Sequence, residues 1–384
     1  MKGFTFQTTR HIVSEPGASA QLGPLMKGLG ATRVLIVTDA GIVKHRLHAP
    51  ALASLADAGI ACDTYAGVVA DPPEAVVLAA VERGRQHRAD GVLGFGGGSS
   101  MDTAKLAAFL LKSEQKLTEI YGLGACKGWR LPLVLVPTTA GTGSEVTPVA
   151  IVTTGASEKM GVVSPQLLPD VAVLDADLTL GLPRPVTAAT GIDAMVHAIE
   201  AFTTKHKKNP MSDTLAKEAL RLLAGNIRKA CFDGADREAR AAMLLGAMLA
   251  GMAFTNAPVA AVHALAYPIG GHFHVPHGLS NSLVMPHVMR FNLPAAAAMY
   301  AELAPIVFPT IGGATDAARA EAMIDGIAAL IAEIGLETRL GQVGISHNHV
   351  PMLAEDAMKV TRLLVNNPRE VAYADAVRIY EAAL

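Results

Sequence analysis

Four side chains, one carboxylate and three imidazoles, have the types and the spacing of a metal site. Asp193 and His197 stand four residues apart, a spacing that on a helix places both side chains on one face, one turn apart. Such a pair can bind a cation from one side, and His263 and His277, fourteen residues apart, can complete the site. One hard oxygen and three nitrogens, with no thiolate, suit Fe(II), Zn(II), Mn(II) or Co(II).

The density of histidines in one segment favours metal binding over the alternatives. A single histidine is more often a buried, hydrogen-bonded residue, and an Asp-x3-His pair can be a simple hydrogen bond on a helix face. However, five of the chain's 13 histidines fall between His263 and His287, and metal binding is the commonest cause of such clustering. Two of the five, His272 and His274, are expected to line a pocket from one side of an extended loop.

Two loops of small residues are typical of a phosphate site. Residues 96–102 follow an apolar run and open a helical pattern, so backbone N–H groups and the helix N-terminus could bind an anion. Ser99 stands where the Gly-x-Gly-x-x-Gly fingerprint has its third glycine, and a plain strand–helix turn is the alternative. Residues 137–145 also follow an apolar run and offer four hydroxyls and two glycines. Together they predict a two-phosphate or dinucleotide ligand at the carboxyl ends of strands.

Asp39 could set the choice of nucleotide. It ends an apolar run, where a carboxylate can accept hydrogen bonds from both ribose hydroxyls of an adenosine and would repel a 2′-phosphate. This favours NAD over NADP. An ordinary helix N-cap is the alternative role for Asp39.

The order of the elements predicts two domains. Uniformly apolar runs, typical of parallel strands buried on both faces, alternate with helical patterns at 74–87 and 101–111. These runs are 33–38, 91–95, 133–136 and 171–174. From about Pro185 the pattern is helical. We therefore expect an α/β dinucleotide-binding domain at 1–183 and an all-helical domain at 184–384, with Phe4–Val13 as a separate edge strand or hairpin.

Composition narrows the class of protein. The chain has 384 residues, a formal net charge of −2 and 4% aromatic residues, which does not indicate nucleic acid or an anionic membrane as a partner. Three widely spaced cysteines predict a reducing, cytoplasmic location, and the N-terminus has no signal-peptide pattern. The most apolar stretch, 241–266, contains Asn256, Pro258 and His263 and is expected to form buried core helices.

Four stretches in this order resemble the iron-containing (group III) alcohol dehydrogenase family: 96–105, 137–145, 191–200 and 263–278. The resemblance implies a dehydroquinate synthase-like architecture with the active site between the domains, dimerisation through N-terminal strands, and a metal bound by Asp193, His197, His263 and His277. Nucleotide contacts are implied for Asp39, Gly96, Gly97, Gly98, Ser99, Asp102, Thr138, Thr139, Thr142 and Lys159. The implied cofactors are NAD and Fe2+, with Zn2+ or another divalent metal in its place.

One position departs from the family pattern. Many members have a second histidine four residues after the third ligand, where it forms part of a proton path, and this chain has Tyr267. A phenol, with an ordinary pKa near 10, cannot hold a proton as an imidazolium does, but it can pass a hydrogen bond. Tyr267, with the ligand His277, is therefore a candidate catalytic residue, and pocket lining is the alternative. Phe254 and Met252 could shape the same pocket, although helix core is the more common role.

The reaction that these residues favour is hydride transfer between a small alcohol and NAD. A metal lowers the pKa of a bound hydroxyl, by analogy with water, by about 9 units or roughly 12 kcal/mol. Hydroxyacid–oxoacid transhydrogenases resemble the chain at Tyr267, so that activity is an alternative. A metal-dependent hydrolase would not need the two glycine loops, and a non-catalytic nucleotide-binding protein would not need four ligands. Zinc glycerol dehydrogenases usually have one aspartate and two histidines, so the third histidine favours the iron group.

Overall fold

The computed structural model describes residues 3–155 and 158–384, which form two compact units. One unit comprises Thr8–Leu180 and the other comprises Gly181–Leu384. The described residues up to Gln7 group with the second unit, whereas the sequence analysis had assigned them to the first. The predicted fold class, an α/β domain followed by a helical domain, is confirmed.

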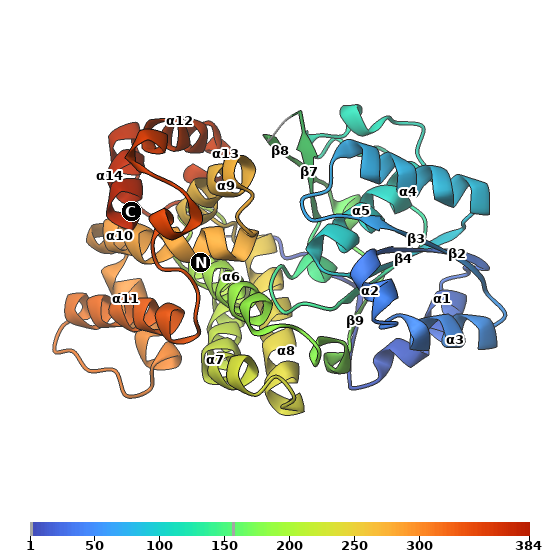
Figure 1. The fold of residues 1–384 in the computed structure, drawn as a ribbon, viewed down its shortest axis with the longest axis horizontal. Helices are drawn as coiled ribbons and strands as arrows, with labels where there is room; N and C mark the ends of the chain where they lie inside the picture. The colour runs from blue at the N-terminus through green and yellow to red at the C-terminus, as the bar shows by residue number, and fades with distance from the viewer. Residues whose placement is uncertain (1–2, 156–157) are drawn as a thin grey trace. The chain divides into compact units, whose positions relative to one another are not determined.

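A six-stranded sheet forms the centre of the α/β unit (Figure 1). Its strand order is β1-β9-β6-β4-β2-β3, and every pair in it is parallel. The four apolar runs predicted as strands are all present, and β3 was missed because its half-buried positions alternate in no simple pattern. The strands are β1 His11–Ser14, β2 Arg33–Asp39, β3 Ala61–Val68, β4 Gly91–Gly96, β6 Leu133–Pro137 and β9 Val171–Leu174.

The expectation of a long N-terminal strand is wrong. Only His11–Ser14 is a strand, paired with β9, and the described residues before His11 form none. The backbone of Gln7 is instead held by an amide side chain: its N–H donates to Asn256 Oδ1 at 2.7 Å and its carbonyl accepts from Asn256 Nδ2 at 2.8 Å. These two bonds explain why this segment groups with the helical unit.

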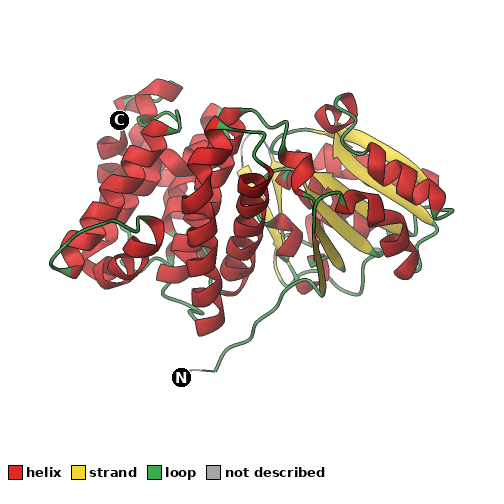
Figure 2. Cartoon of the chain, turned by 90° about the horizontal axis from the view of Figure 1, so that it is seen from below, coloured by secondary structure: helices red, strands yellow, loops and turns green. Residues whose placement is uncertain are grey.

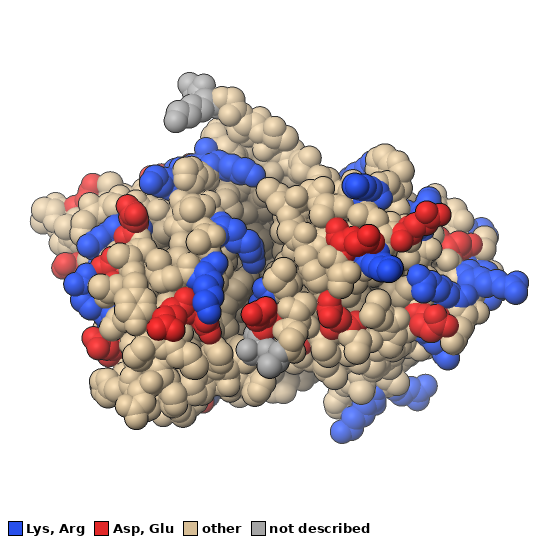
Figure 3. Space-filling model, turned by 90° about the horizontal axis from the view of Figure 1, so that it is seen from above, with Lys and Arg blue, Asp and Glu red and all other residues tan. Residues whose placement is uncertain are grey.

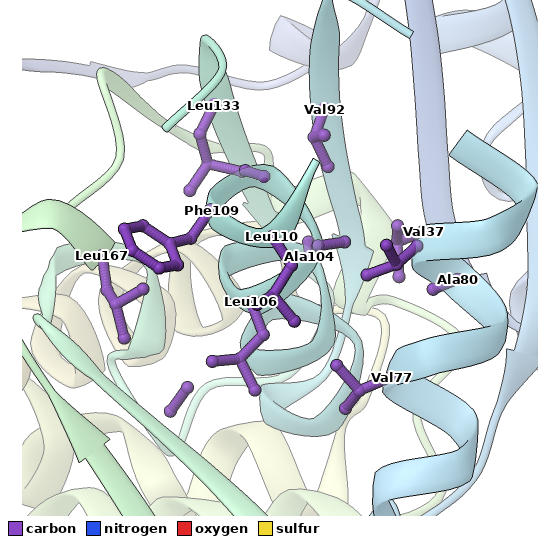
Figure 4. Packing of buried hydrophobic residues seen from close by; sticks show 14 of the residues in the cluster. Val37, Val77, Ala80, Val92, Ala104, Leu106, Phe109, Leu110, Leu133 and Leu167 are labelled. Carbon is purple, nitrogen blue, oxygen red and sulfur yellow. The ribbon is translucent and has the colours of Figure 1, made fainter. Parts of the chain in front are cut away.

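The sheet is buried on both faces, as its sequence indicates. Successive side chains of a strand point to opposite faces, so Leu35 and Val37 of β2 join one core cluster while Val34 and Ile36 join another. Figure 4 shows the first cluster, in which Val37 and Val92 lie near side chains of the covering helices. The helices of this unit are α1 Leu22–Gly28, α2 Ala40–Lys44, α3 Ala49–Asp57, α4 Glu74–His87 and α5 Gly98–Leu110.

A second, three-stranded sheet also lies in the α/β unit and was not predicted. Its order is β5-β8-β7, and β7 pairs with β8 in antiparallel register. The strands are β5 Gly122–Leu123, β7 Val149–Thr154 and β8 Glu158–Val163. It carries Lys159, one of the predicted nucleotide contacts.

The second unit consists of helices joined by loops, as Figure 2 shows. Its centre is α6, which is buried on nearly every side because α7, α8 and α10 pack around it. A helix that is apolar around its whole circumference is typical of such a position. The helices are α6 Arg184–Thr203, α7 Pro210–Phe232, α8 Arg237–Asn256, α9 Ala261–Phe273, α10 His277–Val307, α11 Asp316–Glu333, α12 Val350–Lys359, α13 Thr361–Leu364 and α14 Tyr373–Ala383.

The surface carries charges of both signs. On the face drawn in Figure 3, acidic and basic side chains are interspersed, in keeping with the formal net charge of −2. No helix in the described part of the chain is by itself long and apolar enough to cross a membrane; α8 and α9 pass that test only as a pair, with a bend of 108° between them.

Candidate metal centre and nucleotide site

Three helices of the second unit bring the four predicted ligands together. Asp193 and His197 lie one turn apart in α6, His263 lies in the first turn of α9, and His277 is the first residue of α10. One ligand atom from each lies within 4.8 Å of every other. His277 Nε2 is 3.6 Å and His263 Nε2 is 4.0 Å from Asp193 Oδ1. The fourteen-residue spacing works because α9 ends and α10 begins between the two histidines.

Aromatic rings enclose one side of this cluster. The His197 ring stacks on the His263 ring with a centroid distance of 4.7 Å, and on Phe254 at 4.5 Å. Phe254 comes from α8 and is half-buried. It therefore contacts the cluster directly, which makes it more than a core residue of its helix.

The charge balance within the cluster favours an ionised aspartate. Burial opposes ionisation of Asp193, but His197, His277 and His263 and the hydrogen bond from Asn281 outweigh it, so the pKa of Asp193 lies below its usual range. Asn281 Nδ2 donates to Asp193 Oδ1 at 2.7 Å. Asn281 was not predicted, although it stands four residues after His277 on the same face of α10.

Glu200 is the second residue that the sequence analysis missed. It is buried, and its Oε2 lies 2.6 Å from His263 Nδ1. The same carboxylate accepts two backbone hydrogen bonds at the start of α9, from Ala260 N–H at 2.9 Å and from Val262 N–H at 2.7 Å. A carboxylate cannot donate, so the proton between them belongs to His263 Nδ1 and the lone pair of Nε2 faces the other ligands. A signal was present, since Glu200 lies on the same face of α6 as Asp193 and His197.

The cluster fits a divalent transition metal. His263 Nε2 is buried and forms no hydrogen bond with any residue that the structure describes, which is unfavourable unless another atom binds it. Three imidazoles and a carboxylate are ligands that iron and zinc accept in proteins. The histidine-to-carboxylate contact through Glu200 is the usual support for such a ligand.

Tyr267 lies beside the cluster, whereas His272 and His274 do not lie in the extended loop that was expected. The Tyr267 ring is half-buried, with its centroid 6.0 Å from that of His277. His272 is in the last turn of α9, where its Nε2 lies 2.6 Å from Asp356 Oδ2, and His274 has a left-handed backbone with φ of 54°. The expected extended loop is therefore wrong, because α9 continues through His272.

The two glycine-rich loops meet in the α/β unit. They follow the neighbouring strands β4 and β6, and Thr138 N–H donates to the carbonyl of Gly96 at 3.0 Å. A Cβ atom added to Gly98 would lie 2.8 Å from Thr142, and one added to Gly97 would lie 3.6 Å from Thr139. Only a residue without a side chain allows so close an approach at Gly98. The N-cap of α5 makes no side-chain hydrogen bond, which leaves backbone N–H groups at this end available to an anion.

Asp39 borders the same loops and also caps a helix. Its Oδ1 accepts from the N–H groups of Gly41 and Ile42 at 2.8 and 3.1 Å, so the N-cap role that we considered is present. Its Oδ2 lies 3.5 Å from Ser100 Oγ, near the start of α5. Strand β2 lies between β4 and β3, at the point where chain order reverses and ligands of such sheets bind. One oxygen is thus used by the fold, and the other faces the loops.

Two further predicted contacts have partners within the protein. Asp102 accepts from Ser144 Oγ at 2.6 Å and from Ile151 N–H at 3.0 Å, which joins the loops to β7. Lys159 Nζ forms an ion pair with Asp71 at 2.7 Å and donates to Thr153 Oγ1 at 3.1 Å. Their roles toward a nucleotide remain predictions.

Two buried residues with ionisable side chains lie beside the second loop and were not predicted. Lys105 is fully buried in α5, and its Nζ donates to Ser144 Oγ at 2.7 Å and to the Val149 carbonyl at 2.7 Å. Glu145 is also buried, and burial raises its pKa to about 7, against the attraction of Lys105. Through Ser144 and Val149, Lys105 joins α5 to the second loop and to the start of β7.

Comparisons with known proteins give the same family for both parts of the chain. Residues 9–176 match the family described as iron-containing alcohol dehydrogenase, and residues 187–384 match the C-terminal part of the Fe-containing alcohol dehydrogenase family. The sequence is 38% identical over 374 residues to long-chain-alcohol dehydrogenase 1 of Geobacillus thermodenitrificans, covering 96% of this chain and 93% of that protein.

Two solved structures share the fold over essentially their full length. A 1,3-propanediol oxidoreductase superposes with a TM-score of 0.97 at 34% identity, covering 100% of both chains. Sulfoacetaldehyde reductase from Bifidobacterium kashiwanohense, solved in complex with NAD+, superposes with a TM-score of 0.88 at 28% identity and covers 100% of this chain and 99% of that one.

Proposed function

Because this chain belongs to the iron-containing alcohol dehydrogenase family and is an oxidoreductase that acts on alcohols, we propose that it uses NAD and binds a divalent metal. Iron is the first candidate for that metal. We assign the metal to Asp193, His197, His263 and His277. The observation that carries the proposal is the buried Nε2 of His263, which faces three other ligand atoms within 4.8 Å.

The proposed chemistry divides between the two units. A metal held by Asp193, His197, His263 and His277 would supply the positive charge that lowers the pKa of an alcohol hydroxyl, and NAD would supply the hydride acceptor. The helical unit holds the ligand set: Glu200 fixes the proton of His263 on Nδ1, and Asn281 orients Asp193. Phe254 stacks on His197 and covers that side of the set. Tyr267, beside His277, is the side chain that we propose to pass the alcohol proton toward solvent.

The α/β unit supplies the nucleotide site in this proposal. The backbone N–H groups at the start of α5, with Gly96, Gly97, Gly98 and Ser99, would bind the pyrophosphate. The hydroxyls of Thr138, Thr139 and Thr142 lie on the adjoining loop, and Asp102 supports that loop through Ser144. Asp39 Oδ2 would accept from the adenosine ribose, and Lys159 would contact the nucleotide from β8.

The proposal extends to the cellular location and the oligomeric state. The three cysteines are free thiols, which supports a reducing, cytoplasmic location. Strand β1 lies at an edge of the six-stranded sheet, which supports a homodimer formed through the N-terminal segments of two copies. Light scattering of the full chain and of a chain lacking residues 1–9 tests the dimer: an unchanged mass would contradict it.

The test of the function is reconstitution. Anaerobically purified protein, stripped of metal and reloaded with Fe(II), Zn(II), Mn(II) or Co(II), should reduce NAD+ with a panel of alcohols, followed at 340 nm. His263→Ala should lose metal and activity together while the protein stays folded. The exposed His347→Ala is the matched control and should keep both. Full metal content and normal turnover in His263→Ala would refute the assignment.

A further inference from the structure

We propose that Arg362 is the anion-binding residue of the alcohol site, and that the substrate is a short hydroxy acid or its aldehyde or keto acid. Its carboxylate or sulfonate would pair with the guanidinium while its hydroxyl lies at the ligand cluster. The inference rests on the proposed function and names the substrate class of that same site. Family membership leaves this open, because the similar proteins act, by their names, on neutral 1,3-propanediol and on anionic sulfoacetaldehyde.

Arg362 reaches the ligand cluster through Tyr267. Its Nη2 donates to Tyr267 Oη at 3.4 Å, and its guanidinium carbon lies 5.9 Å from the centre of the Tyr267 ring. That ring in turn lies 6.0 Å from the ring of His277. Tyr267 therefore links the guanidinium to a predicted metal ligand, and all three residues belong to the helical unit.

The backbone of Arg362 is tied to the helix that carries His263. Arg362 belongs to the short helix α13, which packs against α9. The buried Asn366 donates from Nδ2 both to the carbonyl of Arg362 and to the carbonyl of Val259, just before α9, each at 3.0 Å. These two hydrogen bonds fix the backbone of Arg362 relative to the start of α9, and a residue that sets substrate specificity needs such support.

The charge of Arg362 is not used by the fold. Across residues 3–155 and 158–384 it forms no ion pair, whereas Arg378, also in the helical unit, pairs with Asp375. The carboxylate of the neighbouring helix α12, Asp356, is already engaged by His272 and Lys359, both at 2.6 Å. A guanidinium offers five donors in a fork that matches a carboxylate or sulfonate, and Tyr267 accepts from only one of its nitrogens.

The position of the Tyr267 ring between the guanidinium and His277 also indicates the length of the substrate. The guanidinium does not touch His277, so an anion next to the carbinol carbon would fall short of it. We therefore expect a hydroxyl separated from the anion by several bonds, and 3-hydroxypropanoate and 4-hydroxybutanoate should react better than glycolate. Each acid has a neutral counterpart of the same carbon number: 1-propanol, 1-butanol and ethanol.

The experiment compares these pairs on the metal-loaded enzyme with NAD+, in wild type, Arg362→Gln, Arg362→Lys and the control Arg378→Gln. We expect wild type to prefer the longer hydroxy acids over the matched alcohols. Arg362→Gln should lower the ratio of kcat/KM for the acids to that for the matched alcohols by ~10- to 100-fold, the loss of a charge-assisted pair. Arg362→Lys should retain part of the preference, and Arg378→Gln all of it. Adding 2-hydroxyethanesulfonate distinguishes a sulfonate from a carboxylate substrate.

A binding measurement separates this inference from the proposed function. 3-Hydroxypropanoate should raise the melting temperature of wild type more than 1-propanol does, and Arg362→Gln should abolish the difference. If neutral alcohols are oxidised at least as well as the acids, or if Arg362→Gln leaves the ratio unchanged, Arg362 is an ordinary surface arginine and the proposed function stands. If no alcohol or acid reduces NAD+ with any metal, the proposed function fails, while an Arg362-dependent melting shift would still support the anion site.

Discussion

Replacing Glu200 with glutamine should loosen the metal centre without touching a metal ligand. The carboxylate accepts three hydrogen bonds, from His263 Nδ1 at 2.6 Å, Ala260 N–H at 2.9 Å and Val262 N–H at 2.7 Å. A glutamine side chain has one oxygen in place of two, so in either orientation its NH2 group meets at least one of these donors.

The orientation of the glutamine side chain decides whether the metal site or the start of α9 is weakened. If its NH2 group faces His263, the ring must accept at Nδ1 and carry its proton on Nε2, so Nε2 no longer has a lone pair for a metal. If its NH2 group faces Val262, the start of α9 loses a hydrogen bond to a charged group, worth about 1.5 to 3 kcal/mol. We expect metal affinity to fall by ~10- to 100-fold, the usual effect of removing such a support. The free energy of unfolding should fall by about 2 kcal/mol.

Metal competition and unfolding experiments measure the two effects separately. Titration of the loaded protein with a chelator of known affinity gives the metal dissociation constant, and denaturant unfolding of the metal-free protein gives the stability. Glu200→Asp keeps the charge but shortens the side chain and should lie between wild type and Glu200→Gln. Glu218→Gln removes an exposed carboxylate that pairs with Arg221 and should change neither quantity appreciably. A Glu200→Gln protein that binds metal as tightly as wild type would refute the role of Glu200.

Substitutions at three more positions test the remaining assignments. Asp39→Gly should raise the use of NADP(H) relative to NAD(H) by about tenfold or more, because it removes charge repulsion. Glycine replaces an N-cap at a cost of only a few tenths of a kcal/mol, so the free energy of unfolding should change little. An unchanged cofactor ratio would contradict the assignment. Tyr267→Phe should slow the oxidation of neutral alcohols, and Tyr267→His should add a pH step at about 6 to 7; equal rates for wild type and Tyr267→Phe at every pH would reduce Tyr267 to pocket lining. Burial raises the pKa of Glu145 to about 7, so the folded state retains a proton that the unfolded state loses above about pH 4.5. The contribution of Glu145 to stability should therefore be largest below about pH 4.5 and fall by about 3 kcal/mol as pH rises to about 7. Glu145→Gln should flatten that part of the slope in denaturant unfolding; an unchanged slope would show that other groups cause it.

Local periodicity explains what could be predicted. Asp193 and His197 share a face because any helix of 3.6 residues per turn brings positions four apart together, whatever packs around it. The buried parallel strands were visible for a similar reason, since each consists of a continuous apolar run. Strands β3, β7 and β8 have mixed sequences, without the continuous apolar run of a strand buried on both faces, so the packing around them decides their structure.

The sequence by itself determined the ligand types, the glycine loops and the order of an α/β and a helical domain, because each depends on residues close together in the chain. Tertiary packing alone decided what supports them. Glu200 meets His263 across 63 residues and Arg362 meets Tyr267 across 95, and no local pattern encodes contacts of that separation. The N-terminal segment shows the same limit: its alternating residues predict a strand, but strands need a neighbouring backbone, and the side chain of Asn256 holds Gln7 instead.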